Sequence, residues 1–169
     1  MNKVIREYIN DIDSVSLNTL IDLSQGSLGI ALRFNKSDAI SIYNTILDVI
    51  INLPNSNFKN INDIATEFTI IKNNELLFII ESIMQQFYLK LLKSIVIVDY
   101  SYVNNVLKKE NIALETLKKY LSADQVYNLW SNFERKIYNI RTLNIDLKQT
   151  LIDTFIDIKV AINVEDIKF

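Results

Sequence analysis

Hydrophobic residues recur at three- and four-residue intervals along most of the chain, which is the pattern of amphipathic helices. Residues 74–98 carry such a stripe and are apolar all round in their first half, which predicts a long helix buried at the centre of the fold. A further helix is expected over residues 38–53, with Ser37 as its cap and Pro54 at its end. Shorter helices are predicted at 3–13, 15–24, 28–35, 58–72 and 112–120.

Two more long helices are expected near the end of the chain. Ser122 can cap the first of them, and the same apolar spacing repeats in a last helix after Asn144. The inward face of the first would carry Val126, Leu129, Trp130, Phe133, Ile137 and Ile140, and that of the last Leu147, Leu151, Phe155, Ile158 and Ile162.

Almost nothing in the sequence interrupts these helices. The chain has only two glycines and one proline, the residues that most often end regular structure. The β-branched segment Ile95-Val96-Ile97-Val98 could form a strand by propensity, but it continues the stripe of residues 74–98 and no partner strand is evident. We therefore predict an all-α fold, a helical bundle.

Both glycines lie in one short segment, Ser24-Gln25-Gly26-Ser27-Leu28-Gly29-Ile30-Ala31-Leu32-Arg33. Gly26 is suited to end one helix as a left-handed C′ residue, and Ser27 to cap the next. Gly29 would then fall in the first turn of that next helix, where glycine disfavours the helix by about 1 kcal/mol relative to alanine. A close approach between helices would explain Gly29 better than propensity does.

The composition excludes most catalytic chemistry. The chain has no cysteine and no histidine, so it lacks thiolate and imidazole ligands, thiol nucleophiles and Ser-His-Asp triads. The carboxylate pairs Asp63/Glu67 and Asp153/Asp157 lie four residues apart, but a di-metal bundle would normally add histidines to such pairs. We expect no catalytic residues, no cofactor and no metal, and therefore no enzyme activity of the chain itself.

Charge and hydropathy give a weaker indication of the partners. The formal net charge is −2, and although residues 86–148 are weakly basic, Lys108, Lys109, Lys118 and Lys119 are expected to be solvated helix residues. Tyr127, Trp130 and Phe133 are interpreted as part of a packed stripe rather than a platform for nucleic-acid bases, so direct nucleic-acid binding is not expected. No apolar run approaches a membrane span and no secretory signal is visible, so we expect a cytoplasmic location.

Two segments resemble the delta-prime family of bacterial DNA polymerase III clamp-loader subunits. Gly26 to Leu32 are similar to the Gly-Ser-x-Gly-x-Ala-Leu corner that ends the AAA+ lid of that family. The helix that carries Trp130, the turn at Asn144 and the helix that follows Asp146 are similar to the end of these proteins, notably those of alphaproteobacteria. The residues that carry the resemblance are Gly26, Ser27, Gly29, Ala31, Leu32, Trp130, Asn144 and Asp146.

The resemblance implies that residues 1–36 end an AAA+ lid and that residues 37–169 form the collar domain. ATP-hydrolysing clamp-loader subunits typically have, at the position of Gly29, an arginine that touches nucleotide phosphate, so Gly29 implies a subunit that does not hydrolyse ATP. The family's nucleotide-binding core, with its degenerate phosphate loop, its zinc module and its Ser-Arg-Cys motif, would precede Met1. The chain is therefore expected to be a C-terminal part of such a subunit.

The resemblance also implies the role and the partners. Collar domains of this family pack into a ring that holds the clamp loader together, so the direct partners would be the delta and gamma/tau subunits. The sliding clamp and primer–template DNA would be met only indirectly, within the DNA polymerase III holoenzyme. The alternative is a stand-alone helical adaptor or regulator with no role in replication.

Overall fold

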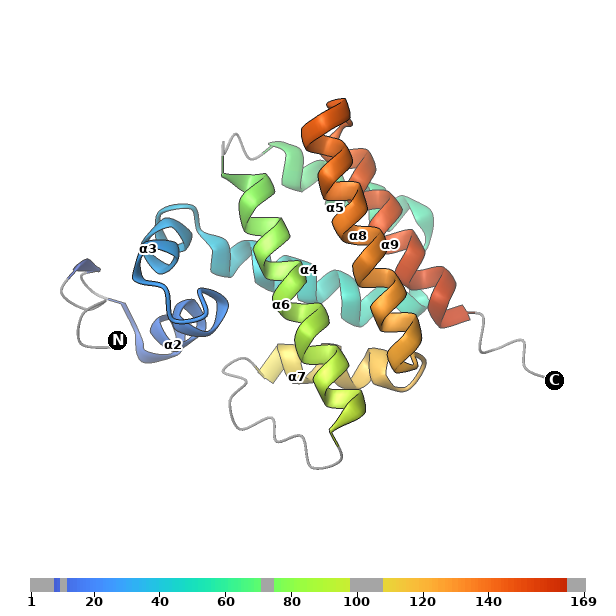
Figure 1. Ribbon diagram of the computed structural model, residues 1–169, viewed down its shortest axis with the longest axis horizontal. Helices are drawn as coiled ribbons and strands as arrows, with labels where there is room; N and C mark the ends of the chain where they lie inside the picture. The colour runs from blue at the N-terminus through green and yellow to red at the C-terminus, as the bar shows by residue number, and fades with distance from the viewer. Residues whose placement is uncertain (1–7, 10–11, 71–74, 98–107, 164–169) are drawn as a thin grey trace.

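The computed structural model describes residues 8, 9, 12–70, 75–97 and 108–163, and within these ranges the chain is helical and contains no strand (Figure 1). The predicted all-α fold is thus confirmed. The first helices are α2 (Ser14–Leu23), α3 (Leu28–Lys36), α4 (Ala39–Asn52), the short 3-10 helix η1 (Leu53–Asn55) and α5 (Phe58–Ile70). They are followed by α6 (Leu76–Val96), α7 (Lys108–Lys118), α8 (Ala123–Leu143) and α9 (Leu147–Asn163).

Helix α6 is the central element, as its hydrophobic pattern predicts. It packs against α8, α7, α4 and α2, and in Figure 1 it lies between the α2–α3 pair on the left and α8–α9 on the right. Helix α9 packs on α5 and α8, and α7 crosses α4. The hydrophobic residues of α6 that are at most 1% exposed are Ile79, Ile80, Ile83, Met84, Phe87, Tyr88 and Leu91.

Most helix limits agree with the prediction. The helix predicted for 38–53 is α4, and η1 carries Pro54 in its first turn, directly after α4. Ser122 accepts a hydrogen bond from the backbone N–H of Gln125, whose side chain accepts one in return from the Ser122 N–H, so the predicted cap of α8 is confirmed as a capping box. Ile95 and Val96 are helical and Ile97 is extended.

The predicted cap of α4 is wrong. Helix α3 continues to Lys36 and Ser37 is its C-terminal cap, which leaves only two residues for the turn into α4. Asp38 occupies the N-cap position of α4 in a left-handed conformation, with φ of 52° and no side-chain cap hydrogen bond. A tight corner, rather than a serine cap, therefore begins α4.

The predictions for 3–13 and 112–120 also need correction. Most of the first range lies outside the described residues, and Asp13, at its end, is extended because it caps α2 through hydrogen bonds from Val15 N and Ser16 N. The second helix, α7, begins earlier than predicted, at Lys108, and ends at Lys118. Val98 and residues 71 and 72 of the other predicted helices lie outside the described residues.

Lys159 of the last helix, α9, binds backbone carbonyls just after the end of α4. The Lys159 ammonium of α9 donates to the carbonyl oxygens of Leu53 at 3.0 Å, Ser56 at 2.7 Å and Pro54 at 3.4 Å. These carbonyls follow the C-terminus of α4, where a cation also interacts favourably with the helix dipole. Lys159 therefore links α9 to the backbone oxygens of η1 and of the residue after it.

One buried polar atom has no such compensation. The Tyr88 hydroxyl is buried in α6, against the rings of Phe87 and Phe133, and has no hydrogen-bond partner among the described residues. Burial, with a smaller contribution from the negative charge of Asp157, raises the pKa of Tyr88 far above its usual value, so the phenol stays neutral. An unsatisfied hydroxyl in this position costs stability.

Removing that hydroxyl should therefore not harm the fold. We expect Tyr88→Phe to leave the free energy of unfolding unchanged or to raise it by about 1 kcal/mol, because the ring packing is kept and the desolvation cost disappears. The control is Tyr43→Phe, which removes a buried hydroxyl that donates to Glu110 and should lower the free energy of unfolding by about 1–3 kcal/mol. Urea denaturation measures both. A larger loss for Tyr88→Phe than for Tyr43→Phe would contradict this assignment.

Candidate functional site

The corner between α2 and α3 is built by backbone hydrogen bonds. The N–H of Gln25 donates to the carbonyl of Asp22, and the N–H of Gly26 donates to that of Ile21, both at 3.1 Å. This is a Schellman ending, in which Ser24 is the C-cap, Gln25 is C′ and Gly26 is C″. Both residues after the cap are left-handed, with φ of 51° at Gln25 and 79° at Gly26. The prediction that Gly26 is C′ is wrong by one residue, since Gln25 takes that place.

The next residues of the corner begin α3. Ser27 is its N-cap and accepts a hydrogen bond from the N–H of Ile30 at 3.4 Å, as predicted. Ala31 is fully buried and Leu32 packs partly buried against the core, so these two positions anchor α3. Gly29 is exposed, and a side chain added to it would meet no atom within 4 Å. The predicted close helix approach at Gly29 is therefore wrong.

A cleft of about 290 Å³ opens between this corner and α6. Its polar lining consists of hydroxyl and amide groups, and its apolar lining includes Ile30 and Phe78. The polar residues are Ser24, Gln25, Ser27, Ser82, Gln85 and Gln86. No ionisable side chain is among the residues that line the cleft, so its serine hydroxyls have no neighbouring acid or base there and the lining offers hydrogen bonds.

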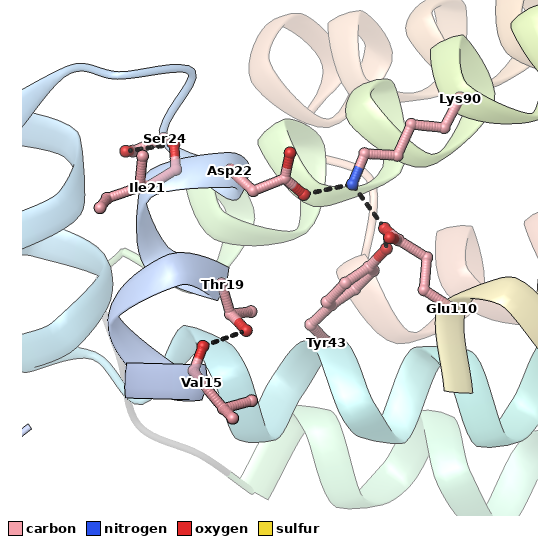
Figure 2. Close-up of polar contacts among 8 residues, drawn as sticks. All are labelled: Val15, Thr19, Ile21, Asp22, Ser24, Tyr43, Lys90 and Glu110. Atoms are coloured by element: carbon pink, nitrogen blue, oxygen red, sulfur yellow. Dashed lines mark hydrogen bonds and ion pairs between the residues drawn. The ribbon is translucent and has the colours of Figure 1, made fainter. Parts of the chain in front are cut away.

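The charged cluster of the described chain centres on Lys90 of α6. Its ammonium donates to Glu110 of α7 at 2.7 Å and to Asp22 of α2, and the Tyr43 hydroxyl of α4 donates to the same oxygen of Glu110 (Figure 2). The side chain of Glu110 is 1% exposed, that of Lys90 11% and that of Asp22 30%. We call these four residues the Lys90 network.

The Lys90 network stabilises the charged form of Lys90, although the side chain of this lysine is largely buried. Burial opposes the charged form, but the negative charges of Glu110 and Asp22 and their hydrogen bonds hold the pKa of Lys90 above its usual value of 10.5. Because this pKa is raised in the folded state, the charged lysine stabilises the fold at neutral pH, and this contribution is lost only as the pH rises through the raised pKa. The network is a structural element that joins four helices.

The second predicted group of residues lies at the turn between α8 and α9. Asn144 is left-handed, with φ of 53°, and serves as the C-terminal cap of α8. Asp146 accepts a hydrogen bond from the N–H of Gln149 at 2.9 Å, so its predicted role as the cap of α9 is confirmed. This turn and the α2–α3 corner lie in separate parts of the molecule, so the eight signature residues do not form a single site (Figure 1).

The aromatic residues of α8 divide between the core and the surface. Phe133 is buried and Trp130 is partly buried, with its Nε1–H donating to Glu134 at 3.0 Å. Tyr127, however, is 63% exposed, so its predicted place in the packed stripe is wrong. Its position on the helix lies about 100° from that of the buried Val126, which turns it to the solvent.

A second tyrosine of α8, which was not among the predicted site residues, is also exposed. Tyr138 is 65% exposed and lies eleven residues further on, about three helical turns or ~16 Å along the same side of α8. The eleven-residue separation from Tyr127 is visible in the sequence and could have predicted that Tyr138 lies on the same side of the helix. Tyrosine is enriched at protein interfaces, because it offers a large rigid apolar area with a polar end. We call Tyr127 and Tyr138 the α8 tyrosine face.

In the described part of the chain, five basic side chains form ion pairs with carboxylates of other segments, and Lys90 and Arg33 are two of them. Lys109 pairs with Asp48 at 2.9 Å, Lys136 pairs with Asp157 at 2.7 Å, and Arg141 forms a two-pronged pair with Glu81. Lys108, Lys118 and Lys119 are exposed, as predicted. These lysines are dispersed along α7 and the turn after it, and the ion pairs neutralise much of the remaining positive charge.

The carboxylates of the Asp153/Asp157 pair accept hydrogen bonds from nearby side chains. Asp157 accepts from Lys136, and Asp153 accepts from the Gln149 amide at 2.8 Å. Across the described ranges, no group of three or more aspartates and glutamates lies close enough together to hold a metal ion. Among the described helices, none is both long and apolar enough to cross a membrane.

No protein-family model, curated protein or solved structure matches this chain. Function must therefore be inferred from the two signature segments and from the surfaces that the fold exposes.

The two glycines should respond oppositely to alanine. Gly29→Ala should raise the free energy of unfolding by about 0.5 kcal/mol, because the added methyl group meets open space and favours the helix. Gly26→Ala should lower it by about 1 kcal/mol, because φ of 79° strains any residue with a Cβ. Thermal unfolding of both variants beside the unmodified chain measures this. A destabilising Gly29→Ala would restore the close-approach explanation.

The Lys90 network should show strong coupling in a double-mutant cycle. Lys90→Met should lower the free energy of unfolding by about 3 kcal/mol or more, because it leaves Glu110 charged and buried without its cation. Adding Glu110→Gln should recover a large part of that loss, since no uncompensated charge then remains in the core. Urea denaturation of the two single variants and the double variant gives the coupling energy. Strictly additive effects would mean that the ion pair does not govern the stability of this region.

Proposed function

We propose that this chain is an assembly module of a bacterial replicative clamp loader, of the delta-prime type, without catalytic activity of its own. Residues 1–36 would end the AAA+ lid and residues 37–169 would form the collar domain. The observation that carries the proposal is the order of two local structures. A Schellman corner with a serine-capped helix at Gly26–Leu32 precedes, by most of the chain, a tryptophan-bearing helix and an Asn144 turn.

The exposed surface of α8 supports an assembly role. Helix α8 packs its inner side on α6 and α9, and presents the α8 tyrosine face to the solvent. Exposed tyrosines at helical spacing, with Glu134 on the turn between them, have the composition of a partner-binding surface with an aromatic centre and a polar rim. A standard interface would bury on the order of 800 Å² on each side.

The proposal sets the partners and the place of action. The direct partners would be the delta and gamma/tau subunits, and the sliding clamp and primer–template DNA would be reached only through them. ATP hydrolysis would belong to the other subunits, since the cleft beside the α2–α3 corner has no ionisable lining and Gly29 replaces the nucleotide-sensing arginine. The chain would act in the cytoplasm, where the replicative polymerase works.

Association with purified clamp-loader subunits tests this function. The chain should co-elute with the delta and gamma/tau subunits in gel filtration at micromolar concentration. The double variant Tyr127→Lys/Tyr138→Lys should weaken binding at least tenfold, because charge would replace the aromatic centre of the interface. The matched control is Ile112→Lys, which alters an exposed apolar residue on α7 and should bind like the unmodified chain.

The outcomes separate the proposal from its alternative. Absence of co-elution with every clamp-loader subunit would contradict the replication role and leave the stand-alone adaptor as the better explanation. Co-elution that the tyrosine variant does not weaken would keep the role but move the interface away from α8. Circular dichroism of each variant establishes that the helices are retained.

A further inference from the structure

The outer side of α8 carries exposed residues at a regular spacing. From the first turn of the helix to the last, exposed residues recur at alternating steps of three and four positions. This is the heptad spacing by which two helices pack along each other. We call these residues the α8 heptad row, and its members are Asp124, Tyr127, Ser131, Glu134, Tyr138 and Arg141.

The α8 heptad row lies away from the side of α8 that the fold uses. Val126, Phe133 and Ile137 are at most 2% exposed and belong to the core that α8 shares with α6 and α9. Figure 1 shows α8 on the near side of the molecule, with no described helix in front of it. Within the described part of the chain, this side of α8 is therefore not covered by another helix.

The two ends of the row carry opposite charges. Asp124 lies in the first turn of α8 and Arg141 in the last, and the two tyrosines lie one step further in. Two copies of α8 that run in opposite directions, with the midpoints of their rows together, would bring unlike ends into contact. Such an interface is isologous, because a two-fold axis between the copies repeats every facing pair. The facing pairs are Asp124 with Arg141, Tyr127 with Tyr138, and Ser131 with Glu134.

Each of these facing pairs is chemically favourable. The carboxylate and the guanidinium attract at both ends, the tyrosine rings supply a large apolar contact, and the serine hydroxyl can donate to the glutamate carboxylate. A parallel arrangement would instead place each residue beside its own copy, so that Asp124, Glu134 and Arg141 would all meet a like charge. Charge complementarity therefore selects the antiparallel pair.

The charged members of the row have capacity left for these contacts. Glu134 accepts one hydrogen bond, from Trp130 Nε1 at 3.0 Å, and a carboxylate can accept several. Arg141 pairs with Glu81, but its side chain is 51% exposed and a guanidinium has five N–H donors. Asp124 forms no ion pair within the described part of the chain.

We propose that two copies of this chain associate through the α8 heptad row, antiparallel and about a two-fold axis between Ser131 and Glu134. The row is ~26 Å long from Asp124 to Arg141. Two helices in contact over this length form a small interface, so we expect a dissociation constant on the order of 10–100 μM. The dimer needs only this chain and does not depend on the clamp-loader role. Because it covers the α8 tyrosine face, self-association and binding of a clamp-loader subunit would exclude each other.

Sedimentation equilibrium of the full chain tests the dimer. The unmodified chain should show a reversible monomer–dimer equilibrium between about 5 and 200 μM. Asp124→Arg should weaken association at least tenfold, because two arginines then meet at each end, and Arg141→Asp should do the same with two aspartates. An equimolar mixture of these two variants should dimerise again. One end then pairs the two introduced charges, and the other end pairs the two native ones.

The matched controls are Asp63→Arg and Lys36→Asp. They make the same changes of charge at exposed positions of α5 and α3, and each should dimerise like the unmodified chain. Circular dichroism establishes that every variant keeps its helices. Asp124→Arg breaks no ion pair within the described part of the chain, so it remains a valid test even if Arg141→Asp disturbs the pair with Glu81.

The outcomes of this experiment and of the clamp-loader experiment can be told apart. A chain that stays monomeric up to about 200 μM would overturn the dimer, whether or not clamp-loader subunits bind it. If such a monomeric chain co-elutes with those subunits, the row belongs to them alone. A dimer that tolerates Asp124→Arg would also overturn the proposal, because its contact would lie elsewhere.

The direction of the two helices can be measured separately. The chain has no cysteine, so one spin label per copy can be attached at Thr142→Cys, an exposed position near the end of α8. In the antiparallel pair the two labels lie at opposite ends, ~30 Å apart, whereas a parallel pair would bring them to ~10 Å. Double electron–electron resonance measures this distance in the dimer. The shorter distance would overturn the antiparallel arrangement.

Discussion

The structure depends on the burial of α6, a helix of which all but one side is apolar. Such a helix must be covered on several sides, and α4, α7 and α8 provide this cover with side chains that leave Ile79, Ile83 and Phe87 without solvent contact. Helices α5 and α9 pack on each other and join the rest of the fold mainly through α8, α4 and η1. This requirement explains the arrangement of the helices, because the long helices with an apolar stripe pack around or beside α6.

Lys90 is a charged residue of α6 whose side chain is largely buried, and its ion pairs join helices at the point where they meet. A lysine so deeply placed requires anions, and these come from α7 and α2, while the Tyr43 hydroxyl of α4 satisfies a further lone pair of Glu110. The apolar core extends past this network into the α2–α3 pair, where Leu20, Leu23 and Phe34 are fully or almost fully buried. A cleft with hydroxyl, amide and apolar lining lies between the corner of this pair and α6.

The proposed function rests on a sequence resemblance to clamp-loader subunits and on the exposed tyrosines of α8. The corner at Gly26 and the turn at Asn144 are local structures whose residues carry the likeness to clamp-loader subunits, and they lie far apart in the fold. The α8 tyrosine face adds what a binding role requires, a pair of large aromatic side chains that the core does not use.

Periodicity and turn chemistry were enough to predict the all-α fold, the central position of α6, and the caps at Ser27, Ser122 and Asp146, because each depends on residues within a few positions of one another. The open space beside Gly29 could not be predicted in this way, since the packing of neighbouring helices decides it. The left-handed Gln25 and the exposed Tyr127 are local features, of a Schellman ending and of helix position, that the sequence-based prediction assigned wrongly. The Lys90 network joins residues up to 68 positions apart, and no local pattern encodes such a meeting. Sequence alone thus determined which segments are helical and which sides are apolar. Only the tertiary structure decided which charges would be buried together, because that depends on how the apolar sides pack.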